Sequence, residues 1–180
     1  MVPMLGFLLA LVLVYAGGLT LAAWLAVRPR RLPIVLHPAQ LGVDSVRVDV
    51  PGEVGDLHAW WIAPAEPVGV VVFAHGYYLN RAEWVVEAAR FRAKGYACLL
   101  FDFRAFGGSP GTVTSVGFRE RADVISTVEW ARAHVPAGTP VGAWGSSMGA
   151  AAVAFAAGER PELFDFVVLD SSPVVPLADT

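Results

Sequence analysis

The sequence predicts an α/β fold in which a doubly wound, mostly parallel β-sheet follows an N-terminal transmembrane helix. Residues 1–27 contain no charged side chain and no histidine. Beyond them, short apolar runs typical of buried strands alternate with longer segments of helical periodicity. Strands and helices that alternate along a chain form right-handed crossovers, and these place the strands parallel in one sheet.

The apolar run over residues 1–27 is long enough to span a membrane, because about 20 residues cross the hydrocarbon core. A secretory signal peptide is the alternative, but it would need a basic start and a shorter apolar core. Arg28, Arg30 and Arg31 follow the run directly. Basic residues beside a span tend to stay in the cytoplasm. We therefore expect an uncleaved, single-pass membrane anchor with the bulk of the protein on the cytoplasmic side.

The remaining chain divides into a linker over residues 28–42 and one domain over residues 43–180. The linker contains three prolines between positions 29 and 38. An antiparallel hairpin is expected to open the domain, because two strand-like runs flank a glycine-containing turn. The strands are expected at residues 43–50, 57–62, 68–74, 96–101, 140–144 and 164–169, and the helices at residues 81–94, 115–134 and 150–157.

Composition excludes several classes of function. The formal net charge is −3, and nothing in the sequence indicates a nucleic-acid-binding surface. Cys98 is the only cysteine, which excludes an intrachain disulfide and a cysteine-based metal site. We expect neither a metal nor an organic cofactor, and we expect Cys98 to be a small buried side chain within its apolar run.

The stretch Gly145-Ser146-Ser147-Met148-Gly149 fits the pattern G-x-S-x-G. It lies between a predicted strand and a predicted helix, which is the context that a nucleophile elbow requires. The strand must turn sharply into the helix, so that Ser147 stands at the tip with its hydroxyl exposed. Residues two positions before and after the serine must be small, and Gly145 and Gly149 meet this demand.

Two further motifs precede the elbow. His75-Gly76-Tyr77 directly follows the predicted strand over residues 68–74, and residues 102–109 fit D-x-R-x-x-G-x-S after the next strand. With these three motifs in this order, residues 43–169 resemble the first two-thirds of an α/β-hydrolase. They are most similar to serine esterases, lipases and peptidases of the S33 or S9 kind.

The resemblance implies a mechanism and a role for each motif. Ser147 would attack a carbonyl carbon of a small-molecule or peptide substrate to form an acyl-enzyme, which water then hydrolyses. The backbone N–H groups of Tyr77 and Met148 would form the oxyanion hole. The resemblance gives structural roles to His75, Asp102 and Arg104. It leaves open whether the substrate is an ester, a thioester or an amide.

One part of the expected machinery is missing. In this fold the catalytic triad runs Ser, then Asp or Glu, then His, but all four histidines precede Ser147. We expect the chain to be an inactive fragment that lacks the acid and the histidine and whose sheet is truncated after the strand over residues 164–169. Asp170, at the end of the last predicted strand, is a weak candidate for the acid, because most members of the resembled family carry the acid one strand later. A non-catalytic membrane-tethered scaffold, or pseudoenzyme, and an acyltransferase remain as alternatives, and the sequence gives no oligomeric state.

Overall fold

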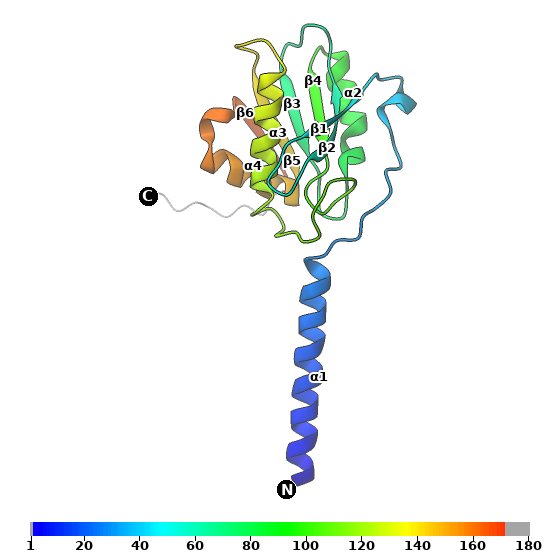
Figure 1. The fold of residues 1–180 in the computed structure, drawn as a ribbon, viewed down its shortest axis with the longest axis vertical. Coiled ribbons are helices and arrows are strands. Elements are labelled where there is room, and N and C mark those ends of the chain that lie inside the picture. Colours follow the sequence, from blue (N-terminus) through cyan, green and yellow to red (C-terminus); the bar gives the residue numbers. More distant parts are fainter. Residues whose placement is uncertain (1, 172–180) are drawn as a thin grey trace.

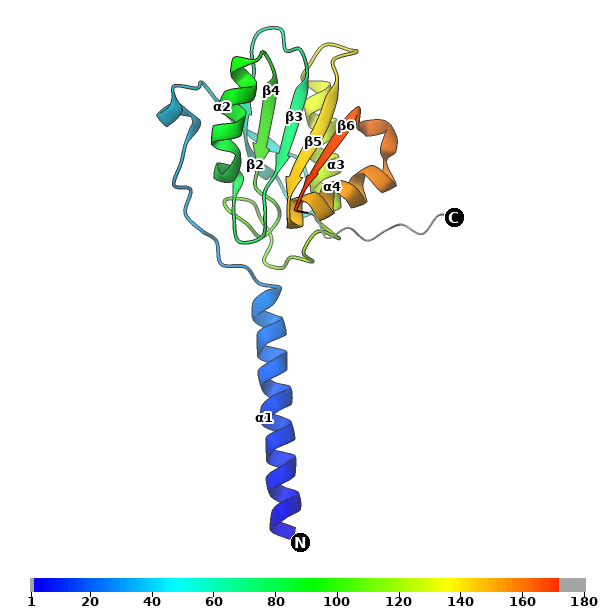
Figure 2. The same cartoon turned by 180° about the vertical axis from the view of Figure 1, so that it is seen from behind.

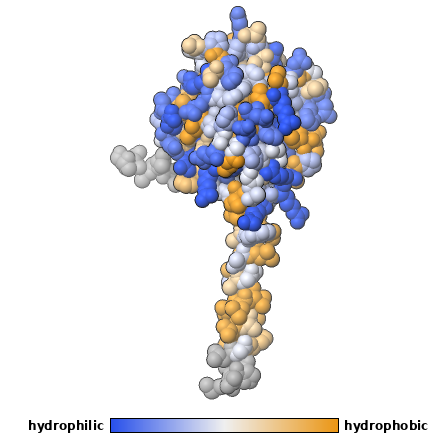
Figure 3. Space-filling view, viewed as in Figure 1, coloured by the Kyte–Doolittle hydropathy of each residue, from blue (hydrophilic) through white to orange (hydrophobic). Residues whose placement is uncertain are grey.

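The computed structural model describes residues 2–171 (Figure 1), with side chains from residue 6 onward. Helix α1 (Val2–Ala26) projects from the rest of the molecule as an isolated rod, and none of its Gly6–Ala26 stretch is buried. This stretch of 21 residues is long and apolar enough to cross a membrane, although signal sequences share these properties. Figure 3 shows that α1 presents hydrophobic surface, whereas the domain surface is mixed.

The domain is built on one six-stranded sheet with the order β1-β2-β4-β3-β5-β6. Strands β1 and β2 form an antiparallel hairpin, and β2 is also antiparallel to β4, whereas β3, β4, β5 and β6 are parallel. The predicted doubly wound, mostly parallel sheet is therefore confirmed. The strands are β1 (Val46–Val50), β2 (Leu57–Ile62), β3 (Val70–Ala74), β4 (Ala97–Phe101), β5 (Val141–Ser146) and β6 (Phe166–Asp170).

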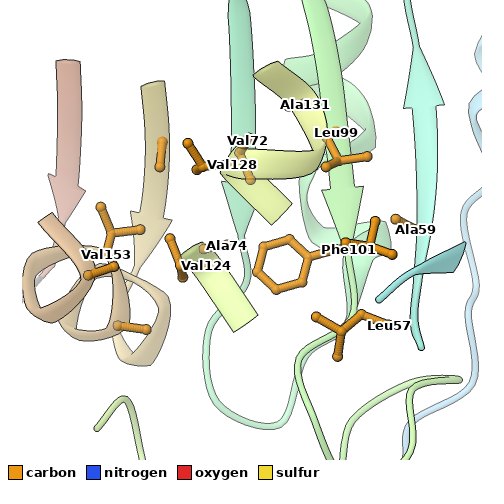
Figure 4. Packing of buried hydrophobic residues seen from close by; sticks show 14 of the residues in the cluster. Leu57, Ala59, Val72, Ala74, Leu99, Phe101, Val124, Val128, Ala131 and Val153 are labelled. Atoms are coloured by element: carbon orange, nitrogen blue, oxygen red, sulfur yellow. The ribbon is translucent and has the colours of Figure 1, made fainter. Parts of the chain in front are cut away.

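Helices cover both faces of this sheet, as Figures 1 and 2 show from opposite sides. Helix α2 (Val85–Ala93) packs on one face, and α3 (Arg121–Ala133) and α4 (Met148–Glu159) pack on the other. Strand β3 is buried on both sides, because Val72 faces the α3 and α4 layer while Phe73 faces α2. This explains its continuous apolar sequence. Figure 4 shows the first of these two layers, in which Val72 and Val128 lie close together.

Cys98 lies in β4 and is fully buried, as expected. Burial raises the pKa of its thiol to about 12, which keeps the thiol protonated and unreactive.

The prediction of a helix over residues 115–134 was wrong at its start, since α3 begins at Arg121. The buried carboxylate of Glu120 is the physical reason. It accepts hydrogen bonds from the backbone amides of Ser115 (3.0 Å) and Gly117 (2.8 Å) and from the hydroxyls of Thr114 (2.7 Å) and Ser115 (2.8 Å). The segment folds around this carboxylate as a loop because its backbone amides find an acceptor there.

The predicted helix over residues 81–94 also differs in detail. Residues Arg81–Trp84 form a 3₁₀ turn, and the α-helix starts at Val85. The side chain of Asn80 accepts a hydrogen bond from the amide of Ala82 (3.0 Å) and thereby caps this first turn.

We predict that Glu120→Gln lowers the free energy of unfolding by about 2–3 kcal/mol, because hydrogen bonds to a charged group are each worth about 1.5–3 kcal/mol. Equilibrium denaturation in detergent micelles measures this loss. Glu159→Gln is the matched control, because the ion pair of Glu159 with Arg121 lies at the surface and contributes at most about 1 kcal/mol. Equal losses in the two variants would contradict this role of Glu120.

Candidate active site

The turn between β5 and α4 places Ser147 at its tip. Ser147 has φ 51° and ψ −110°, a backbone conformation that residues other than glycine rarely adopt. Such strain costs about 1–3 kcal/mol and persists only when the surroundings hold it. Here the amide of Ser147 donates to the carbonyl of Asp170 (2.9 Å), and its carbonyl accepts from the amide of Ala151 (3.1 Å). The side chain of Ser147 is exposed, so its hydroxyl is accessible.

The two flanking glycines lie where a side chain has no room. A Cβ atom at Gly145 would lie 2.5 Å from the backbone nitrogen of Ala150, and one at Gly149 would lie 2.7 Å from the carbonyl oxygen of His75. Real Cβ atoms essentially never approach other atoms this closely. The start of α4 therefore lies directly against the end of β3, and this close contact explains why the turn needs small residues on both sides.

This contact brings the loop after β3 to the elbow. A Cβ atom at Gly76 would lie 3.6 Å from the hydroxyl of Ser146, so the loop runs beside the residue that precedes Ser147. In the described part of the chain, the amides of Tyr77 and Met148 donate no hydrogen bond. Met148 is the first residue of α4, where amides lack partners within the helix and carry partial positive charge. Both amides are thus available to a negatively charged oxygen.

Glu83, which belongs to none of the three sequence motifs, holds the loop in place. Its carboxylate accepts a hydrogen bond from the amide of Gly76 (2.7 Å). Burial raises the pKa of Glu83, and its hydrogen bonds with Gly76 and Ser146 oppose this shift. The spacing of Asn80 and Glu83 fits a capping box, which could have signalled a carboxylate that binds a nearby backbone amide.

His75 is fully buried and both of its ring nitrogens are engaged. Nδ1 donates to the carbonyl of Gly76 (2.8 Å), and Nε2 accepts from the amide of Phe103 (3.1 Å), a tautomer that these two partners require. Burial is the main cause that lowers the pKa of His75. The ring therefore stays neutral and links two loops, which matches a structural role and leaves no nitrogen to act as a general base.

The loop after β4 is organised by Asp102 and Arg104, both of them buried. The carboxylate of Asp102 accepts from the amides of Arg81 (2.8 Å) and Gly108 (2.7 Å) and forms an ion pair with the Arg81 guanidinium (2.6 Å). Arg104 forms a buried ion pair with Asp123 of α3 (2.7 Å). Both side chains are fully used in holding the loop, as the resemblance implied.

The structure places Asp170 at the end of β6, where it pairs in register with Ser146. Its carboxylate is exposed and accepts a hydrogen bond from the hydroxyl of Ser171 (2.9 Å). Asp179, a further carboxylate that follows Ser147 in the sequence, lies outside the described residues. Between residues 2 and 171, no histidine forms a hydrogen bond with Ser147, and no group of three metal-binding side chains is found.

A sharp turn with an exposed serine at its tip, at the end of a central strand in this strand order, is typical of the α/β-hydrolase class. A family model of the X-Pro dipeptidyl-peptidases (S15 family) matches residues 55–179. The chain belongs to this family, and the resemblance to α/β-hydrolases is confirmed.

Three further proteins are similar to the chain. The Pyrococcus furiosus esterase Pf2001 superimposes with a TM-score of 0.71 at 32% identity, over 82% of this chain and 59% of that one. XC6422 from Xanthomonas campestris, described as an a/b serine hydrolase without lid, gives a TM-score of 0.56 at 27% identity, over 66% and 57%. YqkD of Bacillus subtilis (strain 168) is 28% identical over 116 residues, which are 64% of this chain and 38% of that protein. The chain thus spans well under two thirds of the length of each of these relatives.

We predict that Gly149→Ala destabilises the domain by about 1–3 kcal/mol or more, because the new methyl group would force α4 away from β3. Denaturant unfolding followed by tryptophan fluorescence measures the change. Gly158→Ala is the control in the same helix. A Cβ atom there meets nothing within 4 Å, and alanine should stabilise the helix by about 0.5–1 kcal/mol. Equal effects at both positions would contradict the close contact.

We predict an acid-sensitive stability that depends on His75. Its pKa is lower in the folded protein than in the unfolded chain, so its stabilising effect is complete above about pH 6.5 and is lost as the pH falls through the folded-state pKa. The free energy of unfolding then falls by up to about 1.4 kcal/mol per pH unit. Unfolding free energies between pH 7.5 and 5.5 should show a shallower decline for His75→Gln than for the unmodified protein. An equally steep decline in the two proteins would contradict this role of His75.

Proposed function

We propose that the protein is a membrane-anchored serine hydrolase of the esterase, lipase or peptidase kind that acts through an acyl-enzyme on Ser147. The observation that carries this proposal is the strained, exposed position of Ser147 at the start of α4, together with two amides that find no hydrogen-bond partner within residues 2–171. Membership of a peptidase family and similarity to an esterase support it.

In the proposed reaction, Ser147 Oγ attacks the carbonyl carbon of a small-molecule or peptide substrate. The negative oxygen of the tetrahedral intermediate accepts hydrogen bonds from the amides of Tyr77 and Met148, and losing one such donor typically costs about 3–4 kcal/mol. A general base takes the hydroxyl proton of Ser147 and passes it to the leaving group as the bond to that group breaks. Water then adds to the acyl-enzyme carbonyl, releases the acyl group as an acid and leaves a proton on Ser147 Oγ. The strained backbone of Ser147 and the contacts of Gly145 and Gly149 keep these groups in place before substrate binds.

The reaction also needs a general base, because a serine hydroxyl is a weak nucleophile at its ordinary pKa. His75 is unsuitable, since both of its nitrogens hold the loops around it. We propose that an acid and a histidine outside the described residues complete the triad. The similar hydrolases are longer than this chain and so have room for such residues.

The proposal divides the chain into an anchor over residues 1–27, a linker over residues 28–42 and a hydrolase domain over residues 43–180. Helix α1 would span the membrane once, and the arginines that follow it would keep the domain in the cytoplasm. A non-catalytic tethered scaffold is the second candidate. The observation that favours it is that no histidine in residues 2–171 bonds to Ser147.

The test uses the product of the complete open reading frame and a fluorophosphonate probe, which labels activated serines. We predict that Ser147→Ala abolishes labelling and lowers ester hydrolysis by about 10⁴-fold or more. Ser146→Ala is the matched control on the neighbouring serine and should retain labelling. Labelling that persists in Ser147→Ala would contradict the assigned nucleophile, and an unlabelled, inactive unmodified protein would favour the scaffold.

A further inference from the structure

The end of α1 is attached directly to the candidate oxyanion loop. The hydroxyl of Tyr77 donates a hydrogen bond to the carbonyl of Ala26, the last residue of α1. The next carbonyl, that of Val27, accepts from the amide of Thr114 (2.9 Å). Residues 26 and 27 therefore touch two loops of the domain, one of which carries Tyr77 itself.

Arg31 ties the linker to a third loop. Its guanidinium donates to the carbonyls of Phe106 (3.3 Å), Gly107 (2.8 Å), Ser109 (2.6 Å) and Gly111 (2.9 Å) in the loop after β4. The amide side chain of Asn80 donates to the carbonyls of residues 32 and 33 (3.2 and 3.3 Å). A flexible tether would not make these contacts, so the linker fixes the orientation of the domain relative to α1.

This orientation turns the active-site edge of the sheet toward the membrane. In Figures 1 and 2, α1 leaves the domain at the end where β3, β5 and β6 finish. The 21 residues Gly6–Ala26 rise about 1.5 Å each, or about 30 Å in total, which matches the hydrocarbon core. Ala26 then lies at the membrane boundary, and Tyr77 lies one hydrogen bond away. Trp24, with the Arg28 guanidinium 4.6 Å from its ring centre, is typical of a headgroup-level anchor.

Apolar side chains form part of the surface around this edge. Five large apolar or aromatic side chains are 39–50% exposed in the linker and in the loops that bond to residues 26–33: Leu32, Tyr78, Leu79, Val113 and Val116. Leu32 and Leu79 also line a groove of about 440 Å³ together with Pro33, Val35, Leu36 and Ala82. Asn80 and Glu83, whose carboxylate holds the amide of Gly76, also line this groove. Figure 3 shows hydrophobic residues next to hydrophilic ones where α1 meets the domain.

We propose that the substrate is an amphiphilic ester that resides in the bilayer, whose acyl chain enters the active site from the membrane along this apolar surface. The proposal rests on the serine hydrolase function proposed above. Ser147 Oγ forms a bond to the ester carbonyl carbon, the carbon–alkoxy oxygen bond breaks, and the alcohol leaves with the proton that the serine hydroxyl has lost. Water then cleaves the acyl-enzyme and releases a fatty acid. The docked linker keeps the site at the depth where the ester carbonyl of such a molecule lies.

The experiment uses the product of the complete open reading frame in dioleoylphosphatidylcholine vesicles. It compares 4-methylumbelliferyl oleate, which partitions into the bilayer, with water-soluble 4-methylumbelliferyl acetate. The first variant carries ten Gly and Ser residues inserted between Pro29 and Arg30, which lets the domain move away by about 17 Å. The second is Arg31→Ala, which removes the bonds to four carbonyls. Its matched control is Arg30→Ala, since no hydrogen bond of Arg30 appears among the described residues.

We expect the insertion and Arg31→Ala each to lower oleate hydrolysis by about tenfold and to leave acetate hydrolysis within twofold, with Arg30→Ala unchanged on both substrates. Unchanged oleate hydrolysis in the insertion variant would overturn the proposal. If Arg31→Ala lowers both rates through a disturbed loop, the insertion variant decides, because it keeps Arg31 and its partners. Failure of the unmodified protein to cleave either ester would instead contradict the hydrolase function itself.

Discussion

The contact between the start of α4 and the end of β3 is the constraint on which the rest of the site depends. Gly149 lies so close to the carbonyl of His75 that no side chain fits between them. Because β3 and β5 are parallel neighbours, with Ala74 in register with Gly145, both strands end at the same edge. The chain can leave β5 and enter α4 at this spacing only through a sharp turn. Ser147 takes the strained conformation at that turn, and its hydroxyl is left exposed.

Buried carboxylates shape the loops around this edge. Loops lack the regular partners of a strand or helix, so their amides must find other acceptors. Asp102 serves the loop after β4, Glu120 serves the loop before α3, and Glu83 serves the Gly76 amide of the candidate oxyanion loop. Each carboxylate bonds to amides that are several residues away, which restricts the motion of the loop as a unit. The amides of Tyr77 and Met148 have no hydrogen-bond partner among the described residues, as a preorganised anion site requires of its donors.

Local patterns were sufficient to predict the sheet and the elbow. The strand over residues 57–62 has the expected bounds, and the alternation of apolar runs with helical periodicity gave the correct fold class. The sequence periodicity did not predict the structure where a buried or distant polar group determines the backbone conformation. The helix expected from residue 115 starts at Arg121 because Glu120 captures the preceding amides. The contacts of Arg31 could not be predicted at all, because its partners lie 75 to 80 residues away and no local periodicity records them.

The family to which the chain belongs does not by itself decide the substrate, since function depends on the site rather than on the fold. A peptide carries polar amides and, at its N-terminus, a charged amine, and it would need acceptors at the rim of the site. The carboxylates of Asp102, Glu83 and Glu120 already accept hydrogen bonds from loop amides, so Asp170 at the end of β6 is the exposed carboxylate beside them. The side chains that remain exposed around the edge, such as Tyr78 and Leu79, offer contact to hydrocarbon instead. Burying a methylene group gains about 0.8 kcal/mol, so an acyl chain would gain binding energy where a polar peptide would pay to lose water.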